Sequence, residues 1–188
     1  MRRIVYTRRM ILTQTKRFII QNGFRNVTAR NLATYMEMST QPIYKQFDSI
    51  QGLQKELVEE YFQKLGHDFA NQGLPRGNTL EDFALYFVVR SQKEYPWFTQ
   101  LFLTKKRDDD VSASIRQCSF ELFKRLGGIP CKQEPGALER IHEHYLALLI
   151  GLVVWAKQQE RQLSDEELRL LLQAHLAPVM TVTAAVEK

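Results

Sequence analysis

Hydrophobic residues recur at helical spacing along almost the whole chain, and no stretch alternates apolar and polar residues as a β-strand does. The first stretch shows the pattern clearly. One face of the expected helix carries Ile11, Leu12, Thr15, Phe18 and Ile19. Gly23 follows, and glycine is preferred just past a helix end because it adopts positive φ at little cost. The pattern predicts an all-α fold of about nine helices.

Two short helices joined by a tight turn are expected over residues 28–47. Thr28 suits the N-cap of the first helix. The second is expected to begin at about Ser39, because Pro42 is tolerated only in the first turn, where its missing N–H costs no helical hydrogen bond. This is the spacing of a helix-turn-helix, whose second helix enters the major groove of DNA.

A longer fourth helix is expected after Asp48 and Ser49, which can cap its N-terminus, and further helical stretches follow. Residues 145–156 are apolar on every side of a helix, so that helix must be covered from several directions. This run is also too short to cross a bilayer, which needs about 20 residues. We therefore expect a helix-turn-helix domain over residues 1–49 and a helical bundle over residues 50–188.

Positive charge is concentrated in the first quarter of the chain. Residues 1–47 hold nine Lys or Arg and one acid, Glu37, a net charge of +8, whereas the whole chain has a net charge of +5. Such a basic segment attracts polyanions, either DNA phosphates or anionic lipid. A membrane-surface role would place Ile11, Phe18 and Ile19 against lipid, and would make the helix-turn-helix spacing a coincidence.

The second helix of the pair has a polar face with side chains that suit DNA. Ile43 and Phe47 lie one turn apart and are expected to point inward. Four residues would then point outward: Thr40, Gln41, Tyr44 and Lys45. Thr and Gln can read base edges, whereas Tyr and Lys can hold phosphates. Gln41 could also reach a phosphate, and the pattern leaves both roles open.

Several short motifs occur together in this segment. They are Gly23-Phe24, Leu32-Ala33, the pair Tyr44 and Phe47, and the pair Leu53 and Leu57. In combination they resemble the N-terminal domain of the TetR/AcrR family of transcriptional regulators. Three positions depart from the family pattern, and at the first of them Tyr35 replaces a small residue. Glu37 stands where the turn usually has Gly, which predicts positive φ with some strain, and Ile50 or Gln51 replaces a usual Lys.

The resemblance implies a set of DNA contacts. The residues expected at the interface are Thr28, Arg30, Ser39, Thr40, Gln41, Pro42, Tyr44 and Lys45. Thr28 and Arg30 would meet phosphate at the start of the first helix of the pair. The first turn of the next helix would face the bases, and Tyr44 and Lys45 would bind the phosphate backbone of the DNA. Arg2, Arg3, Arg8 and Arg9 would add nonspecific attraction for the polyanion, although Arg2 and Arg3 could equally be a mobile solvated tail.

The resemblance also implies a homodimer through the last two long helices, residues about 137–183, and an effector pocket among the central helices. Aromatic residues that could line the pocket are Tyr86, Phe87, Trp97, Phe98, Phe102 and Tyr145. As a pattern these aromatics are also ordinary core residues, since most pocket walls and most cores are apolar. The all-round apolar run at 145–156 independently favours a covered helix in this region.

The sequence has no pattern typical of catalysis, of a cofactor site or of a metal site. His142 and His144 are two residues apart and point to different sides of a helix, so they make a poor metal pair. Cys118 and Cys131 are too few for a disulfide scaffold and favour a reduced compartment. We expect a cytoplasmic protein that is not an enzyme and that needs no metal or cofactor.

The expected function is a TetR-like regulator that binds a double-stranded DNA operator. The leading interpretation is a repressor whose DNA binding is modulated by a small-molecule effector. The alternative is a DNA-binding dimer whose C-terminal domain binds a protein partner or no ligand. A role at a membrane is not expected.

Overall fold

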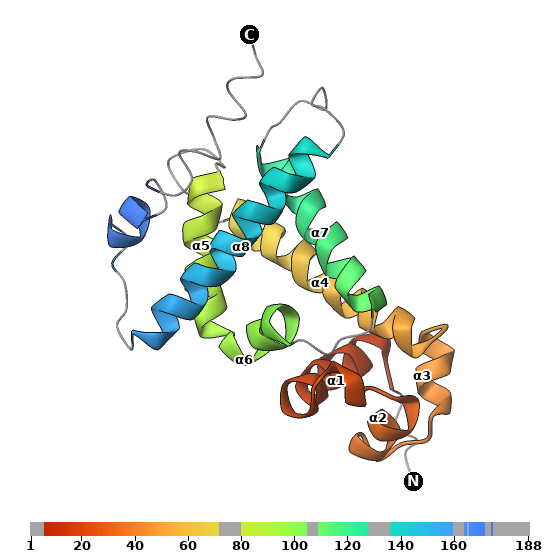
Figure 1. Cartoon of the computed structure of the whole chain (residues 1–188). Coiled ribbons are helices and arrows are strands. Elements are labelled where there is room, and N and C mark those ends of the chain that lie inside the picture. Colours follow the sequence, from red (N-terminus) through yellow and green to blue (C-terminus); the bar gives the residue numbers. More distant parts are fainter. Residues whose placement is uncertain are drawn as a thin grey trace. The chain divides into compact units, whose positions relative to one another are not determined.

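The computed structural model describes residues 6–71, 80–104, 109–127, 136–159, 164, 166–171 and 174. Every regular element in this part of the chain is helical, which confirms the all-α prediction (Figure 1). Eight of these elements are the α-helices α1 to α8, two short helical turns of other types lie between them, and residues 166–171 form a further helical stretch. The chain packs as two compact units. Unit 1 is Met1–Tyr61 with Tyr95–Arg116, and unit 2 is Phe62–Glu94 with Gln117–Lys188.

Unit 1 combines the N-terminal helices with a later segment. Its complete elements are α1 (Arg8–Asn22), η1 (Phe24–Asn26), α2 (Ala29–Tyr35), α3 (Gln41–Gln46), α6 (Tyr95–Phe98) and the π-helical turn η2 (Thr99–Leu103). It also contains the first parts of α4 (Ile50–Ala70) and α7 (Asp109–Gly127). Unit 1 thus takes in more of the chain than the domain over residues 1–49 expected from the sequence.

The first helix forms as its pattern predicts. Thr7 caps α1, and its hydroxyl oxygen accepts a hydrogen bond from the Met10 N–H at 3.3 Å. Gly23 ends the helix with a φ of 81°, the positive value expected at this position. All five residues of the predicted inward face are buried: Ile11, Leu12, Thr15, Phe18 and Ile19. The side-chain amide of Gln54, in α4, donates to the Phe24 carbonyl at 3.3 Å and fixes the chain after α1.

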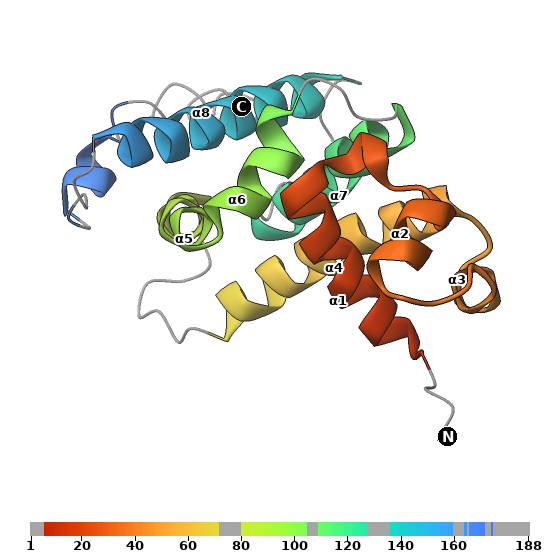
Figure 2. The ribbon, with the colours of Figure 1, turned by 90° about the horizontal axis from the view of Figure 1, so that it is seen from below.

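Unit 2 is built on the later parts of α4 and α7, together with α5 (Leu80–Lys93) and α8 (Ala137–Gln158). α5 packs against α8 (Figure 2). The two helices are joined by a buried hydrogen bond in which the Tyr145 hydroxyl donates to the Leu80 carbonyl at 2.5 Å. Phe69, Phe83 and Phe87 are almost fully buried and form the centre of this core.

The last predicted helix is described only in part. Residues 166–171 are helical, and Ser164 caps them. The Ser164 hydroxyl accepts from the Glu167 N–H at 3.2 Å, and the Glu167 carboxylate accepts from the Ser164 N–H at 3.0 Å, a capping box. The rest of the predicted range to 183 lies outside the described residues, apart from residue 174. None of the described helices is both long and apolar enough to span a membrane.

Candidate nucleic-acid interface

The predicted helix-turn-helix is formed by α2 and α3. Thr28 caps α2 as expected, and its hydroxyl oxygen accepts from the Asn31 N–H at 3.1 Å. α3 begins at Gln41, so Thr40 rather than Ser39 precedes it. Thr40 already has helical dihedral angles, φ −73° and ψ −16°, so α3 begins within one or two residues of the expected start at about Ser39. Pro42 lies in the first turn, where its position was expected to place the helix start.

The turn between the two helices contains a strained residue. Glu37 has a φ of 52°, which confirms the positive value expected where a non-glycine residue occupies this turn. The Met38 N–H donates to the Ala33 carbonyl at 2.9 Å, and the Glu37 N–H donates to the Thr34 carbonyl at 3.2 Å. These two bonds form a Schellman motif, which ends a helix on a left-handed residue and usually uses glycine there. The tight turn depends on Glu37 adopting this conformation.

The orientation of α3 agrees with the predicted polar and apolar faces. Ile43 is fully buried and Phe47 is nearly so, and both hold α3 to the core of unit 1. The predicted interface residues are all exposed except Pro42, which is half-buried. Tyr44 has 55% of its surface exposed, which is high for an aromatic side chain. α3 therefore exposes a polar face while Ile43 and Phe47 hold its other face in the core.

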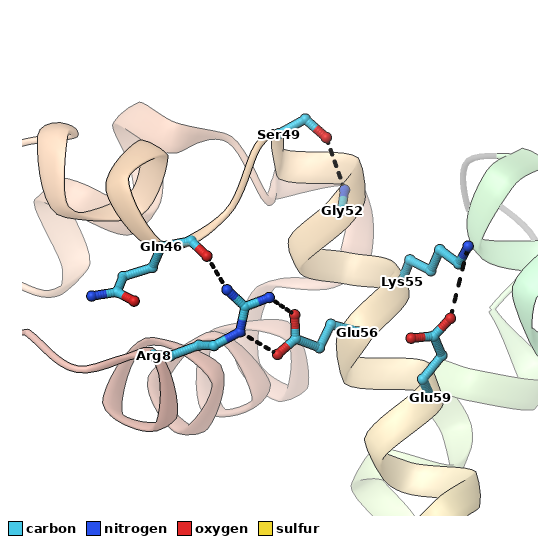
Figure 3. A network of polar contacts seen from close by, with 7 residues as sticks. All are labelled: Arg8, Gln46, Ser49, Gly52, Lys55, Glu56 and Glu59. Carbon is cyan, nitrogen blue, oxygen red and sulfur yellow. Dashed lines mark hydrogen bonds and ion pairs between the residues drawn. The ribbon is translucent and has the colours of Figure 1, made fainter.

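A charged network joins three helices of unit 1 at the end of α3 (Figure 3). The Arg8 guanidinium, in α1, donates to both carboxylate oxygens of Glu56 in α4, and the Nε–Oε1 distance is 2.7 Å. Arg8 also donates to the Gln46 carbonyl at the end of α3 and lies 4.4 Å from the centre of the Phe47 ring. The hydrogen bond to Glu56 raises the pKa of Arg8.

This network gives Arg8 contacts that the sequence did not predict. Glu56 offsets its charge and Arg8 holds the end of α3, whereas the nonspecific attraction expected of Arg8 stays a prediction. Nothing in the spacing of the sequence links residue 8 to residue 56, because the pair meets only through the packing of α1 on α4. The start of α4 does follow prediction: the Ser49 hydroxyl oxygen accepts from the Gly52 N–H at 2.9 Å (Figure 3).

The six aromatic residues predicted for a pocket divide between the two units. Trp97, Phe98 and Phe102 belong to unit 1. There Trp97 is 2% exposed, and its ring centre lies 5.8 Å from that of Phe24 and 6.5 Å from that of Tyr61. Tyr86, Phe87 and Tyr145 belong to unit 2 and are buried.

Unit 2 contains a small cavity of about 20 Å³. Its walls include Phe62, Phe83, Phe87, Phe123, His142 and Tyr145. Of the predicted pocket residues, Phe87 and Tyr145 therefore line it. No sequence pattern marked His142 as a cavity residue, because an isolated histidine in a helix has no distinctive spacing. Within the described part of the chain, no group of three or more His, Cys, Asp or Glu residues is placed to hold a metal ion.

The chain was compared with known proteins at the level of sequence and of structure. No protein-family model matches it, and no curated protein matches it by sequence. Solved structures do match over nearly the whole chain. A protein from Shewanella sp. PV-4, described as a TetR-family transcription regulator, is 16% identical with a TM-score of 0.63, over 94% of this chain and 98% of its own. The chain has the TetR-type fold.

Two further matches extend this result. A transcriptional regulator from Saccharomonospora viridis, solved in complex with choline, is 15% identical with a TM-score of 0.57, and the match covers 90% of this chain and 95% of that one. The fatty acid degradation regulator FadR from Bacillus halodurans is 11% identical with a TM-score of 0.57, over 97% of this chain and 96% of its own. All three proteins with this TetR-type fold are described as regulators.

Proposed function

We propose that this chain is a cytoplasmic transcriptional regulator that binds double-stranded DNA through α2 and α3. The observation that carries this proposal is the exposed polar face of α3, held by the buried Ile43 and presented by a tight turn. A recognition helix needs this combination, because its outer side chains must reach base edges while its inner side chains fix its direction. The TetR-type fold supports the proposal.

The residues of the interface divide into two kinds of contact. Arg30 and Lys45 are exposed cations, and with Thr28 and Tyr44 they would contact phosphates on either side of the groove. Gln41 occupies the first turn of α3 and would reach a base edge. Ser39 and Thr40 lie beside that first turn. Other exposed cations of unit 1 would add sequence-independent attraction: Arg9, Arg17 and Arg25.

DNA binding is tested by fluorescence anisotropy with a labelled duplex over a range of salt concentrations. Lys45→Ala should weaken binding to every duplex and reduce the salt slope by about one unit, as expected for one lost phosphate contact. Lys64→Ala is the matched control, because Lys64 is an exposed lysine of α4 that lies in unit 2. No binding by the unaltered protein, or equal slopes for the two variants, would contradict the proposal.

We also propose that the regulator is a homodimer joined through residues about 137–183. α8 supports this because Trp155 is 40% exposed, a large apolar area for a folded helix. Gly151 and Ala147 are exposed one and two turns before it, respectively, on the same stripe. A side-chain carbon added at Gly151 would meet nothing within 4 Å, so this stripe is open to the close approach of a second copy.

The regulator is proposed to act as a repressor that responds to a small-molecule effector. The cavity of unit 2 supports an apolar site of this kind, since four helices and several aromatic side chains line it. The choline complex of the Saccharomonospora protein shows that one chain with this fold accepts a small ligand. The alternative is a C-terminal domain that binds a protein partner or no ligand. A protein partner is favoured by Leu170, an apolar side chain that is 62% exposed.

A further inference from the structure

Helix α3 is too short to be stable on its own. It has six residues, Gln41–Gln46, and an isolated helix of that length does not persist in water. The buried Ile43 anchors its middle, and the buried Phe47 follows its last residue. The last carbonyls of a helix have no partner within the helix and take hydrogen bonds from elsewhere. The direction of α3 therefore depends on contacts that other elements of unit 1 supply.

Arg8 supplies such a contact and connects the end of α3 to α4 (Figure 3). One nitrogen of its guanidinium donates to the Gln46 carbonyl, and the other two donate to the carboxylate oxygens of Glu56. The guanidinium carbon lies 4.4 Å from the centre of the Phe47 ring. An arginine that donates to both oxygens of a carboxylate is held in one plane, so Glu56 fixes the orientation of the group that holds α3. Glu56 thus acts on α3 through Arg8.

Tyr6, two residues before Arg8, contacts both helices of the pair. Its hydroxyl donates to the Met36 carbonyl at the end of α2, at 3.4 Å. Its carbonyl accepts from the side-chain amide of Gln46 at the end of α3, at 3.5 Å. Both distances are long, so each contact is weaker than an arginine–carboxylate pair. Residues 6–8 therefore touch the ends of both α2 and α3, and the pair of Arg8 with α4 is the strongest of these contacts.

We propose that Arg8 and Glu56 are positioning residues for DNA binding, and that their pair keeps α3 in the direction in which it meets DNA. The role in DNA binding rests on the proposed function, whereas the hold on α3 exists without DNA. The effect of Glu56 has a sign that identifies this role. Electrostatics alone predicts that removing an acid strengthens binding to a polyanion. Positioning predicts that removing Glu56 weakens binding.

The first measurement is anisotropy of the full chain with a labelled duplex that the unaltered protein selects from a random pool. Glu56→Gln should weaken binding about tenfold, as expected if α3 keeps its productive direction in about one molecule in ten. The salt slope should stay unchanged, because no phosphate contact is lost. Urea unfolding of each variant shows that it is folded under the binding conditions.

Glu59→Gln is the matched control for this variant. Glu59 lies on the same helix and pairs at 3.8 Å with Lys55, which is also in α4 (Figure 3). The substitution therefore removes the same charge and breaks an ion pair, but the pair does not join α4 to another helix. Glu59→Gln should bind DNA as tightly as the unaltered protein or more tightly.

A second pair of variants tests the guanidinium. Arg8→Lys keeps the charge but loses the planar fork that reaches two carboxylate oxygens and a carbonyl together. It should weaken binding by a factor similar to that of Glu56→Gln. Arg9→Lys makes the same change at the exposed neighbouring residue and should keep the affinity. Nonspecific attraction from Arg8 would instead leave the two lysine variants equal.

A third measurement needs no DNA. The Phe47 N–H donates to the Ile43 carbonyl at 2.8 Å, at the end of α3. Its hydrogen exchange should be about tenfold faster in Glu56→Gln, because local opening of α3 governs the rate. The Gly23 N–H donates to the Ile19 carbonyl at 2.7 Å, at the end of α1, and its exchange rate should not change.

The proposal is overturned if Glu56→Gln binds DNA as tightly as Glu59→Gln does, or if Arg8→Lys binds as tightly as Arg9→Lys does. It is also overturned if Glu56→Gln leaves the exchange rate of Phe47 unchanged or raises that of Gly23 equally. If the unaltered protein selects no duplex, the proposed DNA-binding function fails, and the exchange rate of Phe47 still decides whether the pair holds α3.

Discussion

Helices α3 and α8 each leave one face exposed, but the two faces differ in chemistry. α3 exposes Gln41, Tyr44 and Lys45 over a fully buried Ile43. α8 is apolar on its buried side and keeps apolar residues on its exposed side, where Trp155 is 40% exposed. A polar face is stable in water and is free to meet a polar partner such as DNA. An exposed apolar face is costly in water and indicates an apolar partner.

This difference indicates how each surface would be used. The face of α3 suits reversible binding, because its hydrated side chains exchange water for phosphates and base edges. The face of α8 suits a lasting contact, because its burial removes apolar surface from water. The comparison predicts that changes on α8 affect assembly and that changes on α3 affect DNA binding.

The largest expected effect comes from Trp155→Glu, which places a charge on the exposed apolar face of α8. Dimerisation should weaken by about thirtyfold or more, because a buried aromatic at an interface contributes about 2 kcal/mol or more. Light scattering and sedimentation measure the change. Gln63→Glu is the matched control, since it adds the same charge at an exposed site of unit 2 outside α8. A wild-type monomer at micromolar concentration would contradict the dimer.

A substitution on α3 sharpens the other side of the comparison. Gln41→Ala should relax the preference at one symmetric base-pair position per half-site, since an amide paired with adenine contributes roughly 1–3 kcal/mol of discrimination. Selection of binding sites from a random pool measures this effect. Uniformly weaker binding with an unchanged motif would instead assign Gln41 to phosphate. Lys45→Ala is the control here, because the loss of a phosphate contact should leave the motif unchanged.

The sequence alone predicted the local features of unit 1 well. The N-cap at Thr28, the inward Ile43 and the positive φ of Glu37 each depend on a few neighbouring residues. Local rules determine such features, because capping, helical spacing and turn geometry act within about one or two helical turns. The start of α3 was predicted to within one or two residues, because Pro42 restricts it to the residues just before the proline.

Features that join distant parts of the chain could not be predicted. The pair of Arg8 and Glu56 spans 48 positions, and the cavity beside His142 is formed by four helices. Such contacts depend on how helices pack, and a single sequence carries no spacing rule for them. The predicted pocket aromatics show the same limit, because Trp97 and Tyr86 are both buried but belong to different units.

A moderate effect is expected from pH, through His142 in unit 2. Burial lowers its pKa in the folded protein, so the unfolded chain binds a proton first as the pH falls below about 6.5. His142 therefore does not change the free energy of unfolding above about pH 6.5. Below that pH the free energy of unfolding falls by at most about 1.4 kcal/mol per pH unit, until the pH reaches the pKa of His142 in the folded protein. Urea unfolding should show that His142→Leu removes part of this loss. His144→Leu should not, and equal pH profiles for the two variants would exclude His142.

The smallest expected effect concerns the turn that presents α3. Glu37 holds a φ of 52°, a conformation that costs a non-glycine residue about 1–2 kcal/mol. Glu37→Gly removes this strain but adds chain entropy to the unfolded state, roughly 0.5–1 kcal/mol, so the net gain in stability should be at most about 1.5 kcal/mol. Glu37→Ala is the matched control, because it removes the same charge and keeps the strain.

The two variants separate strain from charge. Both should bind DNA somewhat more tightly, because each removes the only acid among residues 1–47. Only Glu37→Gly should unfold at a higher urea concentration, since only glycine adopts this φ without a steric penalty. If Glu37→Ala stabilises unit 1 as much as Glu37→Gly does, charge repulsion and not backbone strain is the cost at this turn. The backbone of the turn before α3 would then be free of strain at Glu37.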